Sequence, residues 1–327
     1  MTDIIWITLL GHIVLPVGMI LWVAAGSRAD PCESVLKLAA AVAYGVLLAV
    51  VGVWLLLPPP VWWGYAAGMV VAAAAGCRPR RQAAPNPRGG TALRRLSAAG
   101  LAAVCIAATG VAWIGYSPPS SQVVALASPL APGSYAVLNG GYSILINPHM
   151  KTLHRSELAA FRGQSYALDI VKVDGWGCRA NGLLPQSLED YFIFGVPVYA
   201  PCAGVVAAAE DGIPDRDPTA LEKRSPAGNF VLLECGGAQV LLAHLMQGSV
   251  AVARGERVQT GQPLARVGNS GWSSEPHLHL HAQTVAAAAG APFDADPLPL
   301  RVDGRTLVRG SRLEVAGPPH GRANGLP

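Results

Sequence analysis

Four long apolar runs fill the first 116 residues, and they constrain the fold of this 327-residue chain more than any other feature. A helix needs roughly 20 apolar residues to cross the hydrocarbon layer of a bilayer, so three runs are long enough and one is marginal. The sequence therefore predicts an α-helical membrane anchor of about four transmembrane helices over residues 1–116. The runs cover about residues 3–26, 34–57, 96–116 and the marginal 61–76.

The composition agrees with a membrane-bound first part. The chain is 51% hydrophobic and only 13% charged, which is too apolar for an ordinary soluble domain. Its first residues, MTDIIW, contain Asp3 and no lysine or arginine, whereas a cleaved signal peptide begins with a positively charged region. We therefore expect the first run to be retained as a helix.

The orientation of the anchor follows from its basic residues. Residues 77–95 hold six arginines and no acidic residue. Basic residues in short loops favour the cytoplasmic side, so this loop is expected to be cytoplasmic. With four spans, everything after Tyr116 then lies outside the cytoplasm. With three, the two ends of the chain would lie on opposite sides.

The pattern changes after the anchor. Residues 117–134 are rich in proline and serine, which indicates a linker. Residues 135–310 contain short apolar or alternating segments cut by glycine and proline, which is typical of a mostly antiparallel β-sheet domain. Residues 311–327 show no periodicity and are expected to be a disordered tail.

Three of the six cysteines lie in the external half, where disulfides persist. These are Cys178, Cys202 and Cys235, an odd number, so at most one internal pair can form. A bridge between Cys178 and Cys202 would tie down the irregular stretch between them. The alternative is that all three are small buried residues, as free cysteines often are.

The segment PHLHLHAQ, residues 276–283, places histidines at alternate positions of an expected strand. Alternate residues share one face and lie about 6.6 Å apart, so neighbours can converge on one ion, whereas His277 and His281, about 13 Å apart, cannot. Zinc prefers nitrogen, sulfur and carboxylate ligands. Asp169 in SYALDIV and His244 in LLAHL are further candidates. A carboxylate inside an apolar strand needs a nearby positive charge, which a metal would supply.

Four segments of this domain, in this order, resemble the lysostaphin/LytM-type zinc metallopeptidases, a family of bacterial cell-wall endopeptidases. The resemblance covers about residues 135–310, and its Gly-Asn-Ser-Gly…Pro-His-Leu-His signature is highly specific. It implies a zinc peptidase (hydrolase) with Asp169 and His279 as Zn²⁺ ligands, and with His244 and His277 assisting the attacking water and the transition state. The segments are GVPVYAPCAGVV (195–206), GNFVLLEC (228–235), LLAHL (241–245) and GNSGWSSEPHLHLHAQ (268–283).

The first motif of the family is altered here. The common pattern is His-x-x-x-Asp, but Ser165 stands four residues before Asp169. GQSYALDIV resembles a branch with Gln-x-Tyr-Ala-x-Asp, in which the ligand histidine comes from an upstream loop. His149 is preferred, because LNGGYSILINPH resembles the stretch that precedes the aspartate in that branch, and His154 is the alternative. A degenerate site that uses neither is the remaining possibility.

The resemblance implies hydrolysis of peptide cross-links in peptidoglycan. Together with the predicted anchor and its orientation, it leads us to expect a protein of the bacterial cytoplasmic (inner) membrane whose C-terminal domain faces the periplasm or the cell exterior. Two alternatives remain: a non-enzymatic regulator of cell-wall hydrolases, and a zinc peptidase with a protein substrate. The helices contact the lipid bilayer and could also bind a membrane partner. No basic stripe with aromatic residues is present, which excludes nucleic acid. His281 is interpreted as a partly exposed strand residue, with an outer-shell residue that orients a ligand as the alternative, and Glu275 is interpreted as a surface residue.

Overall fold

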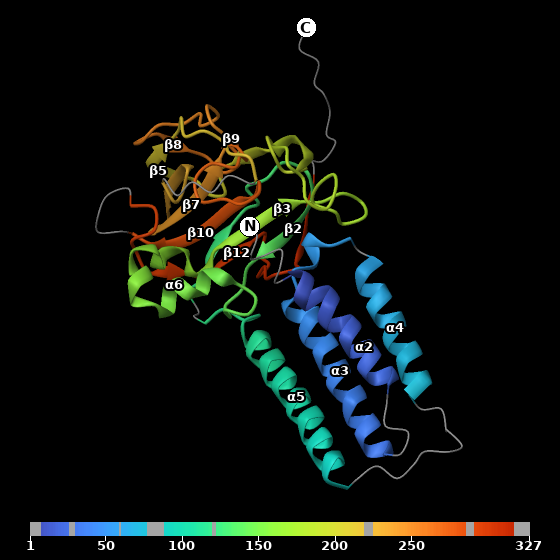
Figure 1. Cartoon of the computed structure of the whole chain (residues 1–327). Coiled ribbons are helices and arrows are strands. Elements are labelled where there is room, and N and C mark those ends of the chain that lie inside the picture. The colour runs from blue at the N-terminus through green and yellow to red at the C-terminus, as the bar shows by residue number, and fades with distance from the viewer. Residues whose placement is uncertain are drawn as a thin grey trace. The chain divides into compact units, whose positions relative to one another are not determined.

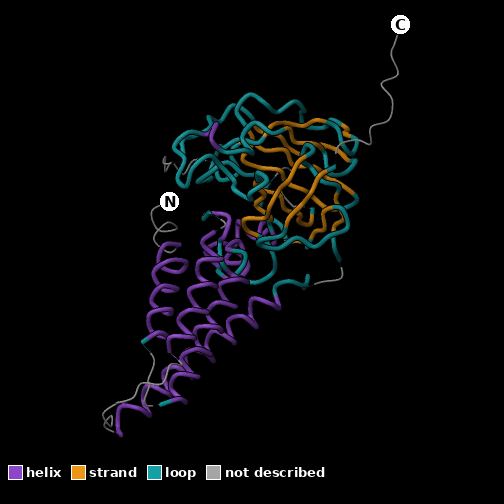
Figure 2. The backbone as a smooth tube through the Cα atoms, turned by 90° about the vertical axis from the view of Figure 1, so that its right-hand side faces the viewer, coloured by secondary structure: helices purple, strands orange, loops and turns teal. Residues whose placement is uncertain are grey.

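The computed structural model divides into two compact units, residues 1–114 and 115–327, which are described separately (Figure 1). The first contains helices and the second contains the strands (Figure 2). The boundary lies two residues before the predicted end of the anchor at residue 116. The structure describes residues 8–25, 30–58, 60–76, 88–119, 122–218, 225–285 and 291–316.

Each predicted apolar run coincides with a helix of the first unit. Two helical segments are long and apolar enough to cross a membrane, Pro31–Val51 and Thr91–Ile114, while two further apolar helices are shorter. The expectation of about four spans therefore holds only as a helical region with two candidate spans. Residues 77–87 of the predicted arginine-rich loop lie outside the described residues, and residues 88–95 are the start of α5 rather than a loop. The elements are η1 (Leu10–Val14), α2 (Leu15–Ala24), α3 (Pro31–Val51), η2 (Trp54–Leu56), α4 (Pro60–Gly76) and α5 (Arg88–Ile114).

Polar contacts fix where α3 begins. The Asp30 side chain accepts a hydrogen bond from the backbone N–H of Glu33, as an N-cap residue does. The same carboxylate forms a two-point ion pair with Arg95 of α5, with N···O distances of 2.8 and 2.6 Å. Small side chains bring the helices together, with Ala41 and Ala72 buried beside Val23. The unit is thus a packed helical bundle rather than a set of separate helices.

The second unit is built on one large, mostly antiparallel sheet, as the sequence predicts. Its strand order is β13-β2-β3-β10-β7-β6-β5-β8, with β11 paired to β10. Two small sheets, β1-β12 and β4-β9, complete the unit. The strands of the large sheet are β2 (Gly133–Asn139), β3 (Leu168–Lys172), β5 (Gly204–Glu210), β6 (Asn229–Cys235), β7 (Ala238–Leu245), β8 (Arg257–Val258), β10 (Leu278–Thr284), β11 (Pro297–Leu298) and β13 (Arg312–Val315). The others are β1 (Val124–Leu126), β4 (Pro197–Tyr199), β9 (Pro263–Arg266) and β12 (Leu300–Val302).

Two predicted boundaries change. The linker expected at 117–134 contains β1 and the start of β2, and the tail expected from residue 311 begins with β13, which pairs with β2. Strands β1 and β13 are too short for an alternating pattern to stand out from the surrounding prolines and glycines. Residues 317–327 lie outside the described part of the chain.

Short helices connect β2 to β3 on the way to the candidate site. They are η3 (Pro148–Met150), α6 (Lys151–His154) and η4 (Ser156–Tyr166), with η5 (Leu188–Asp190) in a later loop. The β2–β3 connection therefore brings a long, mostly helical excursion back to the strand that carries Asp169.

The two faces of the large sheet differ. Leu278 and Leu280 of β10 and Ile170 of β3 point into the main hydrophobic core. Side chains alternate across a strand, so Asp169 and His279 lie on the opposite face. The alternation of side chains that predicted the strands thus also places the core residues on one face of the sheet and the candidate metal-binding residues on the other.

The predicted disulfide is wrong. The structure joins Cys202 to Cys235, with their Cα atoms 6.2 Å apart, and leaves Cys178 free. The reason is the pairing of β5 with β6, in which Val205 lies opposite Glu234 and the residues just before β5 therefore lie beside the end of β6. Cys178 is held elsewhere, since its N–H donates to Asp174 at 2.8 Å.

Candidate metal centre

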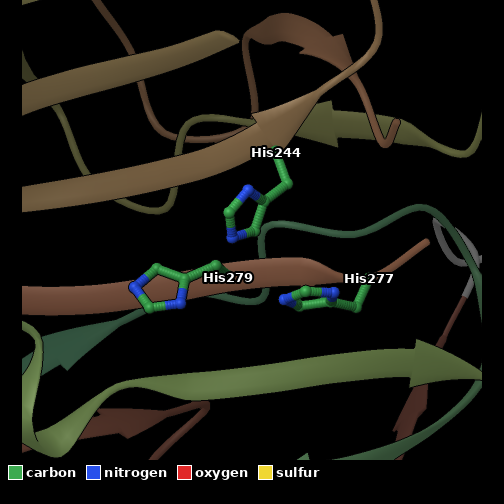
Figure 3. A group of neighbouring side chains, drawn as sticks. All are labelled: His244, His277 and His279. Atoms are coloured by element: carbon green, nitrogen blue, oxygen red, sulfur yellow. The ribbon is translucent and has the colours of Figure 1, made fainter. Parts of the chain in front are cut away.

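Three neighbouring strands carry the site. Asp169 of β3 lies directly opposite His279 of β10 in the antiparallel register, and His279 lies opposite Ala243 of β7. Residues 110 positions apart in sequence are thereby brought to one point of the sheet, where His279 Nδ1 lies 3.1 Å from Asp169 Oδ1. His277, immediately before β10, and His244 point toward the same place (Figure 3).

His244 reaches the site only because β7 is irregular. Leu242 points into the main core, so regular alternation would send His244 there too. The pairing with β6 shifts register at this position, and His244 has a φ of 60°, in the left-handed region that is costly for a residue with a side chain. A bulge of this kind re-aims a side chain. His244 therefore lies on the same face of the sheet as His279, with the centroids of the two rings 5.6 Å apart.

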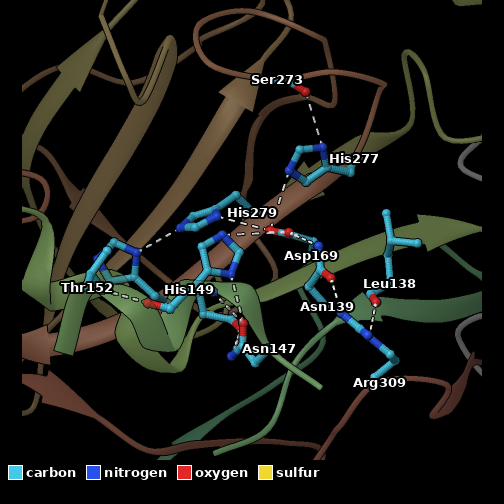
Figure 4. A network of polar contacts seen from close by, with 12 residues as sticks. Leu138, Asn139, Asn147, His149, Thr152, Asp169, Ser273, His277, His279 and Arg309 are labelled. Atoms are coloured by element: carbon cyan, nitrogen blue, oxygen red, sulfur yellow. Dashed lines mark hydrogen bonds and ion pairs between the residues drawn. The ribbon is translucent and has the colours of Figure 1, made fainter. Parts of the chain in front are cut away.

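His149 arrives from outside the sheet through a network centred on Asn147. The fully buried Asn147 amide donates to the backbone carbonyls of Gly141 and Ala167, at 2.9 and 3.0 Å, and so ties the β2–β3 loop to the residue before β3. Its oxygen accepts from the backbone N–H of His149. His149 Nε2 then lies 3.7 Å from Asp169 Oδ2 (Figure 4).

Among the described residues, two overlapping groups of side chains could hold a metal ion. We call His149, Asp169 and His279 the mixed group, and His244, His277 and His279 the imidazole group; within each, the ligand atoms lie within 4.8 Å of one another. Two ligands at about 2.0–2.1 Å on a tetrahedral zinc are about 3.3 Å apart. The contacts of Asp169 with His279 and His149, 3.1 and 3.7 Å, fit that spacing. The mixed group also supplies a negative charge, which suits a buried divalent cation.

Hydrogen bonds on the outer side of three histidine rings leave one unprotonated nitrogen of each ring available to the candidate metal site. The Nδ1 atoms of His149, His244 and His277 lie at 3.0, 2.9 and 2.8 Å from the oxygens of Asn147, Ser270 and Glu275. Each of these oxygens accepts a hydrogen bond, so Nδ1 is the protonated nitrogen of a neutral ring and Nε2 carries the lone pair. Such ring orientation by outer contacts is the usual arrangement in metal sites.

The same segments match a known peptidase family. The model of Peptidase family M23 matches residues 190–294, which include His244, His277 and His279. Residues 190–294 are an M23 metallopeptidase domain. His149 and Asp169 lie upstream of the matched residues, so two of the three members of the mixed group come from the β2–β3 connection and from β3 rather than from the matched residues 190–294.

Several solved structures are similar to the chain. Lysostaphin is 20% identical, over 37% of each chain, with a TM-score of 0.25. A zinc-containing peptidase from Vibrio cholerae is 26% identical, over 32% of this chain and 28% of that one, with a TM-score of 0.21. Csd3 of Helicobacter pylori is 14% identical, over 60% and 36%, with a TM-score of 0.29. The chain therefore covers less than half of each. No curated protein matches it.

The structure separates the two upstream candidates of the altered motif. His149 lies beside the M23 histidines, whereas His154, at the end of α6, is exposed and outside both groups. Ser165, at the usual ligand position, is buried and bonded to Thr152 at 2.8 Å. The β2–β3 loop thus places His149 next to Asp169 from 20 residues away in sequence.

Two further expectations about the M23 domain are wrong. His281 is fully buried rather than partly exposed, with Nδ1 3.1 Å from His279 Nε2. Glu275 is buried rather than on the surface, because Arg179, 96 residues away in sequence, binds its carboxylate at 2.9 Å. Glu275 acts on the site through its backbone oxygen, which holds His277.

The sequence reasoning missed a pair of residues that orient Asp169. Asn139 of β2 donates to Asp169 Oδ2 at 2.9 Å, and Arg309 donates to the Asn139 oxygen at 2.8 Å (Figure 4). Asp169 Oδ1 is thereby left to face His277 and His279, at 3.4 and 3.1 Å. Asn139 stands opposite Asp169 across a bulge in the β2–β3 register, which no local sequence signal reveals.

The buried charges shift the pKa values of the site in opposite directions. Burial lowers the pKa of His149 to about 4 and holds that of His244 well below its ordinary value. Burial would also lower the pKa of His277, but the charge of Asp169 raises it above that value. Burial would raise the pKa of Asp169, yet the charges of His149 and His277 hold it well below the usual range. The metal-free second unit thus favours a proton on His277 and none on His149 or His244.

These shifts predict that the metal-free protein loses stability as the pH falls from about 6.5 to 4.5. In this window the unfolded chain protonates His149, with an ordinary pKa of 6.5, while the folded chain does not until about pH 4. The unfolded state then binds more protons, and that shift alone is worth up to about 3 kcal/mol. His244 acts in the same direction. The contribution of His277 has the opposite sign but changes above this window, since it is fully present below pH 6.5 and is lost as the pH rises through its raised pKa.

The measurement is the melting temperature of the chelator-treated full chain in detergent between pH 7 and 4.5. The His149→Gln variant, which has no ring to protonate, is expected to show a shallower fall. A melting temperature that rises as the pH falls below 6.5 would contradict the account of His149, because the contribution of His277 is already complete there.

Proposed function

We propose that the protein is a membrane-anchored zinc endopeptidase that hydrolyses the peptide cross-links of peptidoglycan. One observation carries this proposal. The ligand atoms of His149, Asp169 and His279 lie within 4.8 Å of one another, beside two more histidines of an M23 metallopeptidase domain. The substrate class follows from the resemblance of this domain to the lysostaphin/LytM-type endopeptidases, which act on the cell wall.

In this proposal the mixed group binds one Zn²⁺ ion. The carboxylate and two imidazole nitrogens give three protein ligands and leave one position open, as catalytic zinc sites do. The bound ion would lower the pKa of a water molecule to about 7 and polarise the scissile carbonyl. Asn139 and Arg309 hold the carboxylate, and Asn147 holds the ring of His149.

His244 and His277 carry the proton transfers in this proposal. Their rings lie side by side, with centroids 4.8 Å apart, and the Nε2 atom of each is turned away from its backbone hydrogen bond. Their pKa values are shifted in opposite directions, which suits one ring to accept a proton and the other to donate one. His277 is the better donor to the leaving amine, and either ring can stabilise the negative oxygen of the transition state.

The first unit supplies the anchor. Two helical segments have the length and composition to cross a bilayer, and the arginine-rich segment 77–95, which runs into the start of α5, favours the cytoplasmic side. The domain that follows α5 would then face the periplasm or the cell exterior, where peptidoglycan lies. The disulfide between Cys202 and Cys235 agrees with an oxidising compartment.

Digestion of purified sacculi by the detergent-solubilised full chain tests the proposal. We expect new muropeptides that disappear with a chelator and return with added zinc. Bound zinc with no products from sacculi would contradict the substrate and favour a protein substrate. Failure to bind zinc would contradict the enzyme itself and favour a regulator of cell-wall hydrolases.

A further inference from the structure

A chain of buried side chains continues behind His279, on the side away from Asp169. His279 Nε2 lies 3.1 Å from His281 Nδ1, and His281 Nε2 lies 3.3 Å from the Gln283 side-chain oxygen. His281 and Gln283 are both fully buried. Neither belongs to the mixed group or the imidazole group. The three residues occupy alternate positions of β10 and therefore share one face of the sheet.

At the far end of this series of buried side chains, hydrogen bonds fix the orientation of the Gln283 side-chain amide. The Gln283 side-chain nitrogen lies 3.1 Å from the backbone carbonyl of Ala291 and 3.1 Å from the side-chain oxygen of Gln239. A backbone carbonyl only accepts hydrogen bonds, so the amide nitrogen of Gln283 must face Ala291 and its oxygen must face His281. Gly163 leaves room for this arrangement, because a Cβ atom there would overlap the Gln283 oxygen.

The positions of the protons follow from that direction. The amide oxygen only accepts, so His281 carries its proton on Nε2. In a neutral ring Nδ1 is then the acceptor, and the hydrogen bond between the two rings must come from the Nε2–H of His279. The remaining lone pair of a neutral His279 lies on Nδ1, 3.1 Å from Asp169 Oδ1, which also only accepts, so a cation (a metal ion or a second ring proton) must lie between these two atoms. His279 is thus oriented through a second imidazole, whereas oxygens hold the other three histidines directly.

We infer that His281 and Gln283 are positioning residues that fix His279 as the tautomer whose Nδ1 atom can bind the metal ion. This inference rests on the proposed function, since it assigns His279 to the mixed group. His281 belongs to neither candidate metal group, and in this inference it acts through its contact with His279. Outer partners of metal-binding histidines typically account for about 10- to 100-fold in metal affinity, and we expect an effect of that size here.

Two substitutions at His281 separate hydrogen bonding from packing. His281→Leu fills most of the buried volume but cannot accept a hydrogen bond. His281→Asn leaves a larger gap but keeps an oxygen near the position of Nδ1. We expect the Leu variant to bind zinc about 10- to 100-fold more weakly and the Asn variant to stay within a few-fold of the parent. Thr284→Val, on the same strand but outside the chain of contacts, is the matched control and should bind zinc as the parent does.

The tautomer can be read directly in the metal-free full chain in detergent, with ¹⁵N-labelled histidine and long-range ¹H–¹⁵N correlation spectra. With the His279 ring neutral, its Nε2 is expected to be protonated in the parent, in Thr284→Val and in His281→Asn. In His281→Leu both tautomers are expected. Gln283→Leu should likewise release the His281 ring to populate both tautomers. The signals are assigned by their loss in single histidine variants.

Several outcomes would overturn the inference. One is a neutral parent His279 whose single ring proton is on Nδ1, and another is a His281→Leu variant with an unchanged tautomer. A Leu variant that binds zinc better than the Asn variant would show that His281 serves packing alone. Because the spectra are recorded without metal or substrate, they remain informative even if the protein does not cleave peptidoglycan.

Discussion

Zinc binding by the full chain is expected to fall at least about 1000-fold when Asp169 is replaced by asparagine, beyond the roughly 10- to 100-fold cost of outer-shell changes. Asparagine has the same shape, so its oxygen can still accept the hydrogen bond from Asn139. What disappears is the negative charge opposite His149 and His279. Hydrolysis of sacculi should be lost together with the metal, and the check is zinc content after equilibrium dialysis.

Two histidine variants serve as comparison and control. His149→Ala should also lose zinc, whereas His154→Ala should keep it, because the exposed His154 lies outside both candidate groups. Thermal unfolding shows whether each variant is folded. Full zinc content in both Asp169→Asn and His149→Ala, in folded protein, would contradict the assignment of the ion to the mixed group.

Replacing His277 with alanine is expected to leave zinc binding intact, unlike Asp169→Asn, but to remove most of the rate of hydrolysis. The ring approaches Asp169 Oδ1 at 3.4 Å, but its pKa is raised above the ordinary value, as suits a group that holds a proton. A positioned acid or base typically contributes about 100- to 10,000-fold to the rate, so kcat should fall by that range. His244→Ala should behave in the same way. Single-turnover digestion of sacculi and metal analysis of the same samples measure both quantities.

The imidazole group supplies the competing result. If the ion lay between His244, His277 and His279, then His277→Ala would lose zinc and Asp169→Asn would lose much less. Loss of metal from His277→Ala and His244→Ala, with metal retained in Asp169→Asn, would therefore reverse the roles proposed for the two groups.

The parts of the structure that could be predicted are those with a regular period. Long apolar runs gave the helices, and the alternation around His279 gave a strand with one apolar and one polar face. Asp169 was identifiable because a carboxylate between Leu168 and Ile170 is costly without a cation. These signals are local, since each can be read within about ten residues.

The remaining features depend on contacts between distant segments. The partner of Cys202 follows from the pairing of β5 with β6, and the burial of Glu275 depends on Arg179. His244 faces the site only because of the register shift in β7, and Asn139 faces Asp169 only because of the bulge in β2. Alternation alone predicts the wrong face for His244, since a bulge adds one residue to one strand of a pair.

The most direct test of the account is the position of zinc in crystals of the protein, located by anomalous scattering at the zinc absorption edge. The account predicts a single peak within about 2.0–2.2 Å of His149 Nε2, a carboxylate oxygen of Asp169 and His279 Nδ1. A peak bonded instead to His244, His277 and His279, with Asp169 out of reach, would contradict it.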